Sequence, residues 1–511
     1  MSAPGLDPTF SELPHRRLGD VALARAQELG ASHADFRFER NSYQYLGARD
    51  GVLQTASDSE DLGFAVRVIH RGAWGFASGV VLTDDEARRL AETAVAVAQV
   101  AATMTTTPVE LAPEPVHDDV TWISGYEVNP LEVPTRDKAD LLVDWTERLR
   151  AGSAVAHATS FLQQVQENKY YADLSGTRTT QQRVRLQPGF EATGEDEQSG
   201  IFDSMASIAP PVGRGWEYLT GDHWDWDAEL AEVPELLAEK LKAPSVEAGA
   251  HDLVVDPSNL WLTIHESIGH ATELDRALGY EANYAGTSFA TYDKLGTLRY
   301  GSEVMNVRGD RTREHGLATV GYDDEGVQTQ EWDIVRDGVL VGYQLDRSMA
   351  HLKPELAGLE SGEGRSNGCA YADSPGHIPI QRMANVSLMP GTDGLSTDDL
   401  VSRVERGIYV VGDKSWSIDM QRFNFQFTGQ RFYKITDGKL DGMLRDVAYQ
   451  ATTTDFWGSM EAVGGPDTWV LGGAFNCGKA QPGQVAAVSH GCPSALFRGV
   501  NILNTIDEAG H

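Results

Sequence analysis

The chain has 511 residues and a formal net charge of −33, because 75 acidic residues outnumber 42 basic ones. Such an excess of negative charge argues strongly against a nucleic-acid partner, since phosphate backbones would be repelled. No apolar run approaches the ~18 residues that a membrane-spanning helix needs. At about 150 residues per domain, the length suggests roughly three domains.

The N-terminus and the cysteines indicate the compartment. The first ten residues have neither the basic nor the apolar region of a signal peptide. Only three cysteines are present, Cys369, Cys477 and Cys492, which argues against a disulfide framework. We therefore expect a cytoplasmic protein in a reducing compartment.

The first predicted domain covers residues 1–105. A short helix is expected over Val21–Leu29, and strands follow with tight turns at Asp50-Gly51 and Arg71-Gly72. Thr83 and Glu86 have the spacing of a capping box, which predicts a helix to about Ala102. This helix–sheet–helix unit contains no obvious catalytic residue.

Residues 106–125 include Pro108, Pro113 and Pro115 and are predicted to be a linker. A middle α+β domain is expected over 126–242. Its predicted elements are a helix at Lys138–Ala151, strands within Ser160–Leu186 that turn at Ser175-Gly176, an acidic surface loop at Glu191–Ser199 and a helix at Trp224–Lys242.

The third predicted domain, 243–511, is rich in strands. Hairpins are expected at Asp337-Gly338 and Asp437-Gly438. One prominent helix is predicted from a cap at Asp256 to a stop at Gly279, directly after the buried strand Leu253–Val255. The predicted fold class is therefore α+β, with a strand-rich C-terminal domain built around one helix.

That helix carries His265-Glu266-Ser267-Ile268-Gly269-His270. Zinc-peptidase helices usually space their histidines four apart, whereas residues five apart point about 140° away from each other on a regular helix. A single π-type turn would bring the two imidazoles together, and Gly269 lies where such a turn is easiest. The motif therefore indicates either a metal site on a distorted helix or two unrelated hydrogen-bonded histidines.

A catalytic zinc usually keeps three protein ligands and an open position for water. Glu266 is the candidate general base, so the third ligand must come from elsewhere. Glu273 could equally be a hydrogen-bond acceptor for His270, and a lone cysteine is often only a small buried apolar residue. Lys479 follows Cys477 closely enough to favour its thiolate form. The candidates for the third ligand are Glu273, Cys477, Cys492, His377 and His490.

Several ordered segments together resemble the TldD/PmbA family of metallopeptidases. They cover most of the chain, which makes the combination far more specific than the hexapeptide. Two stretches, Ala271–Tyr292 and the one around Cys492, depart from the family pattern. The matching segments are Leu62-Gly63-Phe64-Ala65-Val66-Arg67 through Trp74-Gly75-Phe76-Ala77, the His265–His270 hexapeptide, Gly364-Arg365-Ser366-Asn367-Gly368, Arg382-Met383-Ala384-Asn385 through Met389-Pro390-Gly391, and Asn476-Cys477-Gly478-Lys479 with Gly483-Gln484.

The resemblance implies a function and a site. Because the metal motif is present, the chain resembles the catalytic, TldD-like subunit rather than the PmbA-like (TldE) subunit. By motif, His265, His270 and Cys477 would hold one Zn²⁺ per chain and Glu266 would be the base. Unfolded or short peptides, such as leader peptides of modified peptides, would be the substrates. A PmbA/TldE-like partner subunit or a homodimer is implied.

The parts suggest how such a site would work. Zinc would lower the pKa of its water toward ~7, and Glu266 would move the proton to the leaving amine. A strand-rich cleft could hold an extended peptide as an added strand.

Two alternatives stay open at this point. The first is a hydrolase with Cys477 as nucleophile. The second is a non-enzymatic, partner-binding subunit with a structural metal, although such a site has no need of Glu266.

Overall fold

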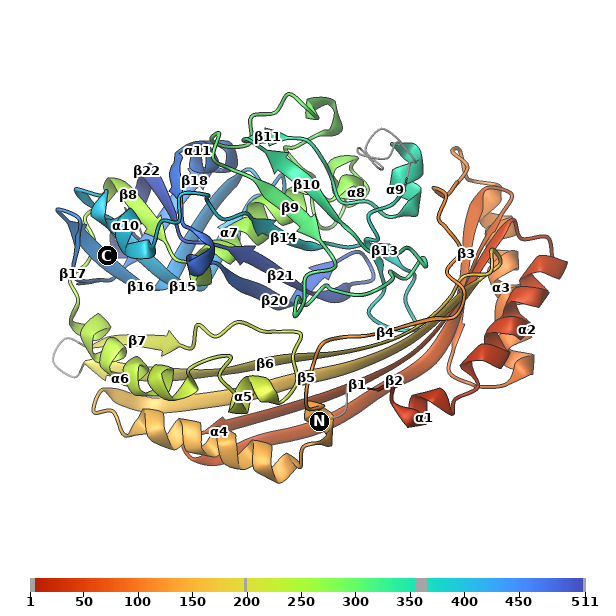
Figure 1. The fold of residues 1–511 in the computed structure, drawn as a ribbon, viewed down its shortest axis with the longest axis horizontal. Coiled ribbons are helices and arrows are strands. Elements are labelled where there is room, and N and C mark those ends of the chain that lie inside the picture. The colour runs from red at the N-terminus through yellow and green to blue at the C-terminus, as the bar shows by residue number, and fades with distance from the viewer. Residues whose placement is uncertain (1–4, 197–199, 354–364, 509–511) are drawn as a thin grey trace.

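The computed structural model describes residues 5–196, 200–353 and 365–508; residues 197–199 and Gly364 of the sequence motifs lie outside them. The N-terminal half is built on one long, curved sheet with the strand order β3-β2-β1-β5-β6-β4, and β7 pairs with β6 (Figure 1). Within this sheet, β4 is the only described strand that runs parallel to its partner, β6. The strands are β1 (His33–Arg49), β2 (Val52–His70), β3 (Ala73–Gly79), β4 (Val120–Ile123), β5 (Val155–Asp173), β6 (Arg178–Asp196) and β7 (Ile201–Ala206).

Helices cover the convex face of this sheet (Figure 1). α2 and α3 pack over one end in a core that includes Phe36 and Phe64, and α4 and α6 pack over the other end around Trp145 and Phe190. The helices of this half are α1 (Pro8–Ser11), α2 (His15–Glu28), α3 (Asp84–Ala102), α4 (Thr135–Arg150), α5 (Glu217–Thr220) and α6 (Trp226–Lys242), with the short η1 (Pro130–Glu132).

The sheet is unusual because its other face is also buried but charged. Along β1, the apolar residues Ala34, Phe36 and Phe38 alternate with Asp35, Arg37 and Glu39, and all six are buried. Successive side chains on a strand point to opposite faces. One face therefore packs on the helices, and the charged face meets the C-terminal half.

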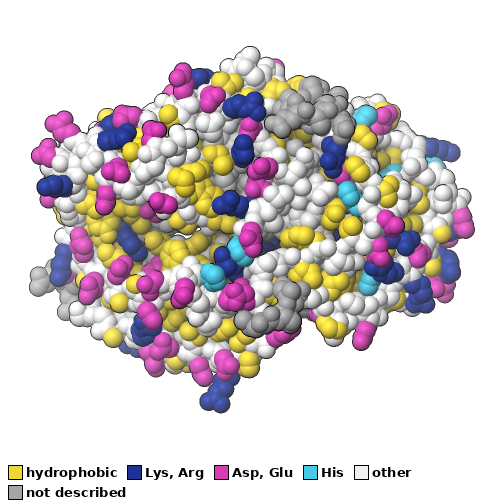
Figure 2. Space-filling model, viewed as in Figure 1, with side chains coloured by type: hydrophobic (Ala, Val, Ile, Leu, Met, Phe, Trp, Pro, Cys, Tyr) yellow, Lys and Arg dark blue, Asp and Glu magenta, His cyan; other side chains and the backbone are white. Residues whose placement is uncertain are grey.

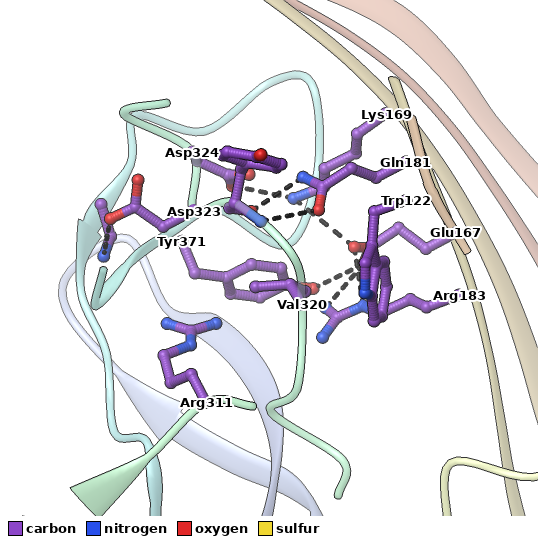
Figure 3. A pocket seen from close by; sticks show the side chains of 12 residues that line it. Trp122, Glu167, Lys169, Gln181, Arg183, Arg311, Val320, Asp323, Asp324 and Tyr371 are labelled. Carbon is purple, nitrogen blue, oxygen red and sulfur yellow. Dashed lines mark hydrogen bonds and ion pairs between the residues drawn. The ribbon is translucent and has the colours of Figure 1, made fainter. Parts of the chain in front are cut away.

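Buried ion pairs join this charged face to the C-terminal half. Lys169 on β5 pairs with Asp324 at 2.8 Å, and the hydroxyl of Tyr371 donates to Glu167 at 2.9 Å (Figure 3). Arg67 on β2 pairs with Asp35 at 2.7 Å and with Glu325 at 3.0 Å. The cavity that Figure 3 shows beside Glu167, Lys169 and Tyr371 has a volume of about 10 Å³. This leaves room for one water at most, so the cluster fastens the two halves and is no substrate pocket.

Two main sheets form the C-terminal half. A seven-stranded sheet has the order β15-β8-β22-β18-β16-β17, with β19 paired to β22, and a four-stranded sheet has the order β11-β10-β9-β14. β20 and β21 make a separate hairpin, as do the short β12 and β13. The strands are β8 (Gly249–Val255), β9 (Val307–Asp310), β10 (Glu331–Arg336), β11 (Val339–Leu340), β12 (Ala370–Tyr371), β13 (Ile380–Gln381), β14 (Asn385–Leu388), β15 (Arg406–Ile418), β16 (Asn424–Thr436), β17 (Lys439–Leu444), β18 (Val447–Thr452), β19 (Met460–Val463), β20 (Val470–Lys479), β21 (Gln484–Cys492) and β22 (Ala495–Asn504).

The helix after β8 lies in the core between these sheets (Figure 1). Among the described residues, no helix has both the length and the apolar character needed to cross a membrane. The helical elements of this half are α7 (Pro257–Ile264), η2 (His265–Gly269), η3 (His270–Thr272), α8 (Leu274–Ala277), η4 (Tyr292–Lys294), α9 (Arg347–Leu352), α10 (Thr397–Ser402), α11 (Thr453–Gly458), η5 (Pro466–Thr468) and α12 (Thr505–Glu508).

The predicted α+β class and the predicted hairpin turns are confirmed. Thr83 caps α3 as expected. The prediction of a surface loop at Glu191–Ser199 is wrong for residues Glu191 to Asp196, because β6 continues to Asp196 and pairs with β7. β4 lies in the predicted linker, and the sheet combines strands from the first two predicted domains. The domain boundaries themselves stay a prediction.

Replacing Arg67 with methionine tests the buried ion pairs that join the two halves. The change leaves the carboxylates of Asp35 and Glu325 buried without their cation, which costs about 3–5 kcal/mol for a buried pair. We expect a correspondingly lower midpoint of urea unfolding for the full chain. Arg88→Met is the control, because Arg88 pairs with Asp85 on the surface and such pairs contribute at most about 1 kcal/mol. Equal shifts for the two variants would contradict the account.

Candidate metal centre

The centre begins with a local distortion of the motif helix. Asp256 caps α7 by accepting from the Ser258 N–H at 3.0 Å. The helix then widens into the π-helical turn η2, His265–Gly269. This extra-wide turn places the rings of His265 and His270 face to edge, with their centroids 4.7 Å apart. The π turn that a spacing of five requires is therefore present.

Side chains from other segments form hydrogen bonds to the backbone carbonyls of the wide turn. The hydroxyl of Tyr300 donates to the carbonyl of Ser267, and Nε2 of Gln344 donates to the carbonyl of Gly269 at 2.7 Å. A side chain at position 269 would have its Cβ 2.5 Å from the sulfur of Met383. Buried carbonyls need such partners, so the turn is fixed by tertiary contacts.

The helix ends earlier than predicted. We expected it to reach Gly279, but Glu273 has an extended backbone and only the single turn α8 follows. The carbonyl of Thr272 accepts from the Gln344 N–H at 2.9 Å, and Leu274 N–H donates to the Gln344 carbonyl at 3.3 Å. These bonds to a distant segment replace the next helical turn and turn Glu273 inward.

The structure brings His265, His270 and Cys477 together. Their ligand atoms all lie within 4.8 Å of one another, and all three side chains are buried. Cys477 comes from β20, where a bulge lies between Ala474 and Cys477. Its sulfur is 3.6 Å from Nε2 of His270. Among the described residues, no other group of three such side chains could hold a metal ion.

A chain of hydrogen bonds fixes the tautomer of His265. Nδ1 of His490 lies 2.8 Å from the carbonyl of Val386, which can only accept, so this nitrogen carries the proton. Burial holds the pKa of His490 well below its usual value, so its Nε2 is free to accept. Nδ1–H of His265 donates to it at 2.7 Å, which leaves Nε2 of His265 unprotonated for a metal.

Glu273 does the same for His270. Nδ1–H of His270 donates to Oε2 of Glu273 at 3.0 Å, so Nε2, beside Cys477, is the ring nitrogen that is left to bind a metal. Burial raises the pKa of Glu273, but Lys479, His270 and Arg276 outweigh it and hold this pKa well below the usual value. Lys479 lies 3.1 Å from Glu273 and 2.8 Å from Asp275. Glu273 is thus an ionised acceptor behind His270.

The thiol of Cys477 is also tuned, though not as expected. Burial raises its pKa, but His270 and Arg382 lower it below the usual value. Arg382 contacts the backbone of Cys477, since its Nη2 donates to the Cys477 carbonyl. Lys479, which we expected to favour the thiolate, contacts Glu273 and Asp275 instead.

The candidate base, Glu266, is buried and forms an ion pair with the partly exposed Arg422. Nη1 of Arg422 donates to Oε2 of Glu266 at 2.6 Å, and the nearby Trp416 side chain helps to lower the pKa of the same carboxylate. Burial raises the pKa of Glu266, but His270, His265 and Arg422 together lower it below the usual value. The carboxylate is therefore ionised, as a general base must be.

The remaining candidate ligands lie outside the cluster. Nδ1 of His377 contacts Asp373 at 2.6 Å. Cys492 is buried with its sulfur 3.6 Å from the carbonyl of Pro257, and burial raises the pKa of its thiol well above the usual value. His490 holds His265 rather than joining the three. Sequence reasoning missed Arg422 and Trp416, for which no local motif gives a signal.

A cleft near this centre lies between the two halves of the molecule. It has a volume of about 460 Å³ and is lined by Phe161 and Phe190 of the sheet and by Trp261, Trp416 and Asn476 of the C-terminal half, among others. Figure 2 shows hydrophobic side chains around a hollow between the two halves. Trp416 lies near Glu266, and Asn476 directly precedes Cys477, so the cleft passes close to the candidate centre.

Replacing His490 with phenylalanine tests the orienting hydrogen bonds. The ring size is kept, but His265 loses the acceptor that fixes its tautomer. Loss of such a partner typically lowers metal affinity about 10- to 100-fold, and we expect this loss in a chelator competition with zinc. His377→Phe is the control, since His377 contacts Asp373 outside the cluster. An unchanged zinc affinity in His490→Phe would contradict the assignment.

Known proteins resemble this chain over nearly its whole length. A metalloprotease from Methanothermobacter thermautotrophicus is 28% identical over 93% of this chain and 96% of its own. A zinc metalloprotease TldD homolog from Saccharolobus solfataricus is 24% identical over 94% of this chain and 98% of its own.

Solved structures share the fold. A Thermotoga maritima protein, proposed as a modulator of DNA gyrase, has a TM-score of 0.74 and 15% identity, and covers 96% of this chain and 100% of its own. TldE from Thermococcus kodakarensis has a TM-score of 0.68 and 16% identity, and covers 95% of this chain and 99% of its own.

Family models match two parts of the chain. Residues 34–98 match the PmbA/TldA metallopeptidase domain 1, and residues 248–504 match the PmbA/TldA metallopeptidase C-terminal domain. The second match contains the π turn and the cysteine strand. The chain belongs to the PmbA/TldD family and is a metallopeptidase.

Proposed function

We propose that this protein is a zinc peptidase that hydrolyses unfolded or short peptides, with His265, His270 and Cys477 as the zinc ligands and Glu266 as the general base. The observation that carries the proposal is the convergence of the three ligand atoms within 4.8 Å. One zinc per chain follows from one such cluster in the described residues.

The donors fit zinc in kind as well as in position. Two imidazoles and a thiolate are ligands that zinc prefers, and three protein ligands leave a fourth position open, as in catalytic sites. Both imidazoles have their Nδ1 protons committed to His490 and Glu273, so both present Nε2. The zinc in the name of the Saccharolobus solfataricus relative supports the same metal.

The residues divide the work of hydrolysis. Zinc, when bound, supplies Lewis acidity and lowers the pKa of a water molecule to about 7. Glu266 accepts a proton from the attacking water and then returns it to the leaving amine. Arg422 holds the Glu266 carboxylate in place by a hydrogen bond. The surrounding cleft restricts the water that reaches these groups.

The edge of strand β20 supports the binding of an extended substrate. Within the described part of the chain, β20 pairs with β21 alone, and Cys477 lies on this strand. A peptide could add to such an edge through backbone hydrogen bonds, which depend little on sequence. Unfolded chains and leader peptides meet this requirement, whereas a stably folded protein does not reach a buried centre.

The setting of the enzyme is part of the proposal. Its likeness to a TldE structure supports a PmbA/TldE-like partner subunit, with a homodimer as the other arrangement. The three cysteines are free, which supports a reducing, cytoplasmic location.

Metal analysis combined with a cleavage assay tests the function. We expect about one zinc per chain in the wild type and in Glu266→Gln, and a large loss of zinc in Cys477→Ala, because the thiolate is a ligand. Glu266→Gln should lose turnover of an unfolded peptide while it keeps the metal. Full turnover in Glu266→Gln would remove Glu266 as the base, and full zinc retention in Cys477→Ala would remove the cysteine as a ligand.

A cysteine hydrolase is the second candidate, because Cys477 lies 3.6 Å from Nε2 of His270. Chelation separates the two functions, since a thiol nucleophile needs no metal. We expect 1,10-phenanthroline to abolish peptide cleavage and added zinc to restore it. Iodoacetamide would inhibit either enzyme and serves only to show that the thiol is required. Undiminished cleavage by metal-free protein would favour the cysteine mechanism.

A further inference from the structure

A partly exposed arginine, Arg422, lies beside the candidate base. Nη1 of Arg422 donates to Oε2 of Glu266 at 2.6 Å, and its Nη2 donates to the carbonyl of Ala285 at 3.3 Å. We propose that Arg422 is a catalytic residue that donates to the carbonyl oxygen of the scissile peptide bond as negative charge develops there. This inference rests on the peptidase function proposed above.

Exposure distinguishes Arg422 from the two other arginines around the centre. Arg276 is fully buried and binds Glu273 and the carbonyl of Ala285. Arg382 is buried as well and binds the carbonyls of Cys477 and Gln484. The side chain of Arg422 is 15% exposed, so of the three it is the one that a ligand can reach.

Arg422 also has donors to spare. A guanidinium has five N–H bonds. Within the described residues, Arg422 donates only from Nη1 to Glu266 and from Nη2 to the carbonyl of Ala285. Its buried Nε has no hydrogen-bond partner there either. The remaining Nη protons leave the group able to donate to a further oxygen without giving up Glu266.

The backbone holds Arg422 in an unusual conformation. Its φ is +62°, a left-handed value that costs a non-glycine residue about 1–3 kcal/mol and persists only where neighbours enforce it. The Asp419 carboxylate accepts the backbone N–H groups of Gln421 and Phe423 at 3.0 and 2.9 Å. The hydroxyl of Thr453 donates to the Arg422 carbonyl at 2.8 Å. The loop between β15 and β16 thus aims the side chain at Glu266.

The position suits the movement of charge in hydrolysis. When water attacks, a C–O bond forms, the carbonyl π electrons move to oxygen, and the proton of the water moves to Glu266. Negative charge therefore leaves Glu266 and arrives on the carbonyl oxygen. The proton then moves to the leaving nitrogen as the C–N bond breaks, which gives a carboxylic acid and an amine. A guanidinium beside both positions is preorganised for this change.

The test compares Arg422→Met and Arg422→Lys with the wild type, each loaded with zinc. Four quantities are measured: the zinc content, kcat and KM for an unfolded peptide, and the Kd of a phosphinic peptide, whose oxygens mimic the tetrahedral state. In Arg422→Met we expect unchanged zinc, KM within a few-fold, and kcat lower by about 100- to 1,000-fold. The phosphinic peptide should bind more weakly by a similar factor, and the lysine variant should lie between.

Controls separate this role from a structural one. Arg308→Met removes a partly exposed arginine that pairs with Asp333, outside the centre, and should leave all four quantities unchanged. Guanidinium ions should restore part of kcat to Arg422→Ala. Loss of zinc together with kcat, or unchanged phosphinic-peptide binding in Arg422→Met, would overturn the inference. A zinc-loaded wild type that cleaves no peptide would overturn the peptidase function and the inference with it.

Discussion

The spacing of the two motif histidines is the constraint on which the centre depends. Side chains five apart on a regular α-helix point about 140° away from each other, so His265 and His270 could not share a metal ion there. The π turn removes this obstacle and brings their rings to 4.7 Å. It is an irregular turn in the middle of a core, and it survives because Tyr300 and Gln344 bind its carbonyls.

Around that turn, buried polar groups set the state of each proposed ligand. His490 and Glu273 fix the tautomers of the two imidazoles, and Arg382 lies behind Cys477. A second set of buried charges, on the sheet, joins the two halves of the molecule. Partners of this kind hold a site close to its productive geometry before any ligand arrives.

Local signals predicted much of the fold, because they act over a few residues. Asp-Gly turns and the cap at Thr83 carry their own geometry, and both were found where expected. Predictions failed where distant contacts decide the structure. The strand through Glu191 depends on pairing with β7, and the end of the motif helix depends on Gln344.

The same distinction applies to the candidate site. The hexapeptide alone gave the π turn as one of two interpretations, the other being two unrelated histidines. Cys477 lies 207 residues beyond His270 and was singled out as a ligand through the family resemblance. The positions of His490 and Arg422 beside their partners are properties of the fold, and no spacing in the sequence reveals them. Lys479 shows the same limit, since its contacts are to Glu273 and Asp275 rather than to the thiol.

X-ray absorption spectroscopy of the zinc-loaded protein tests the proposed centre most directly. A site of His265, His270 and Cys477 predicts one sulfur neighbour at about 2.3 Å and imidazole nitrogens at about 2.0–2.1 Å, with a further light atom at the open position. The sulfur shell should disappear in Cys477→Ala. A wild-type spectrum with only nitrogen and oxygen neighbours would contradict the proposed ligands, whatever the activity of the protein.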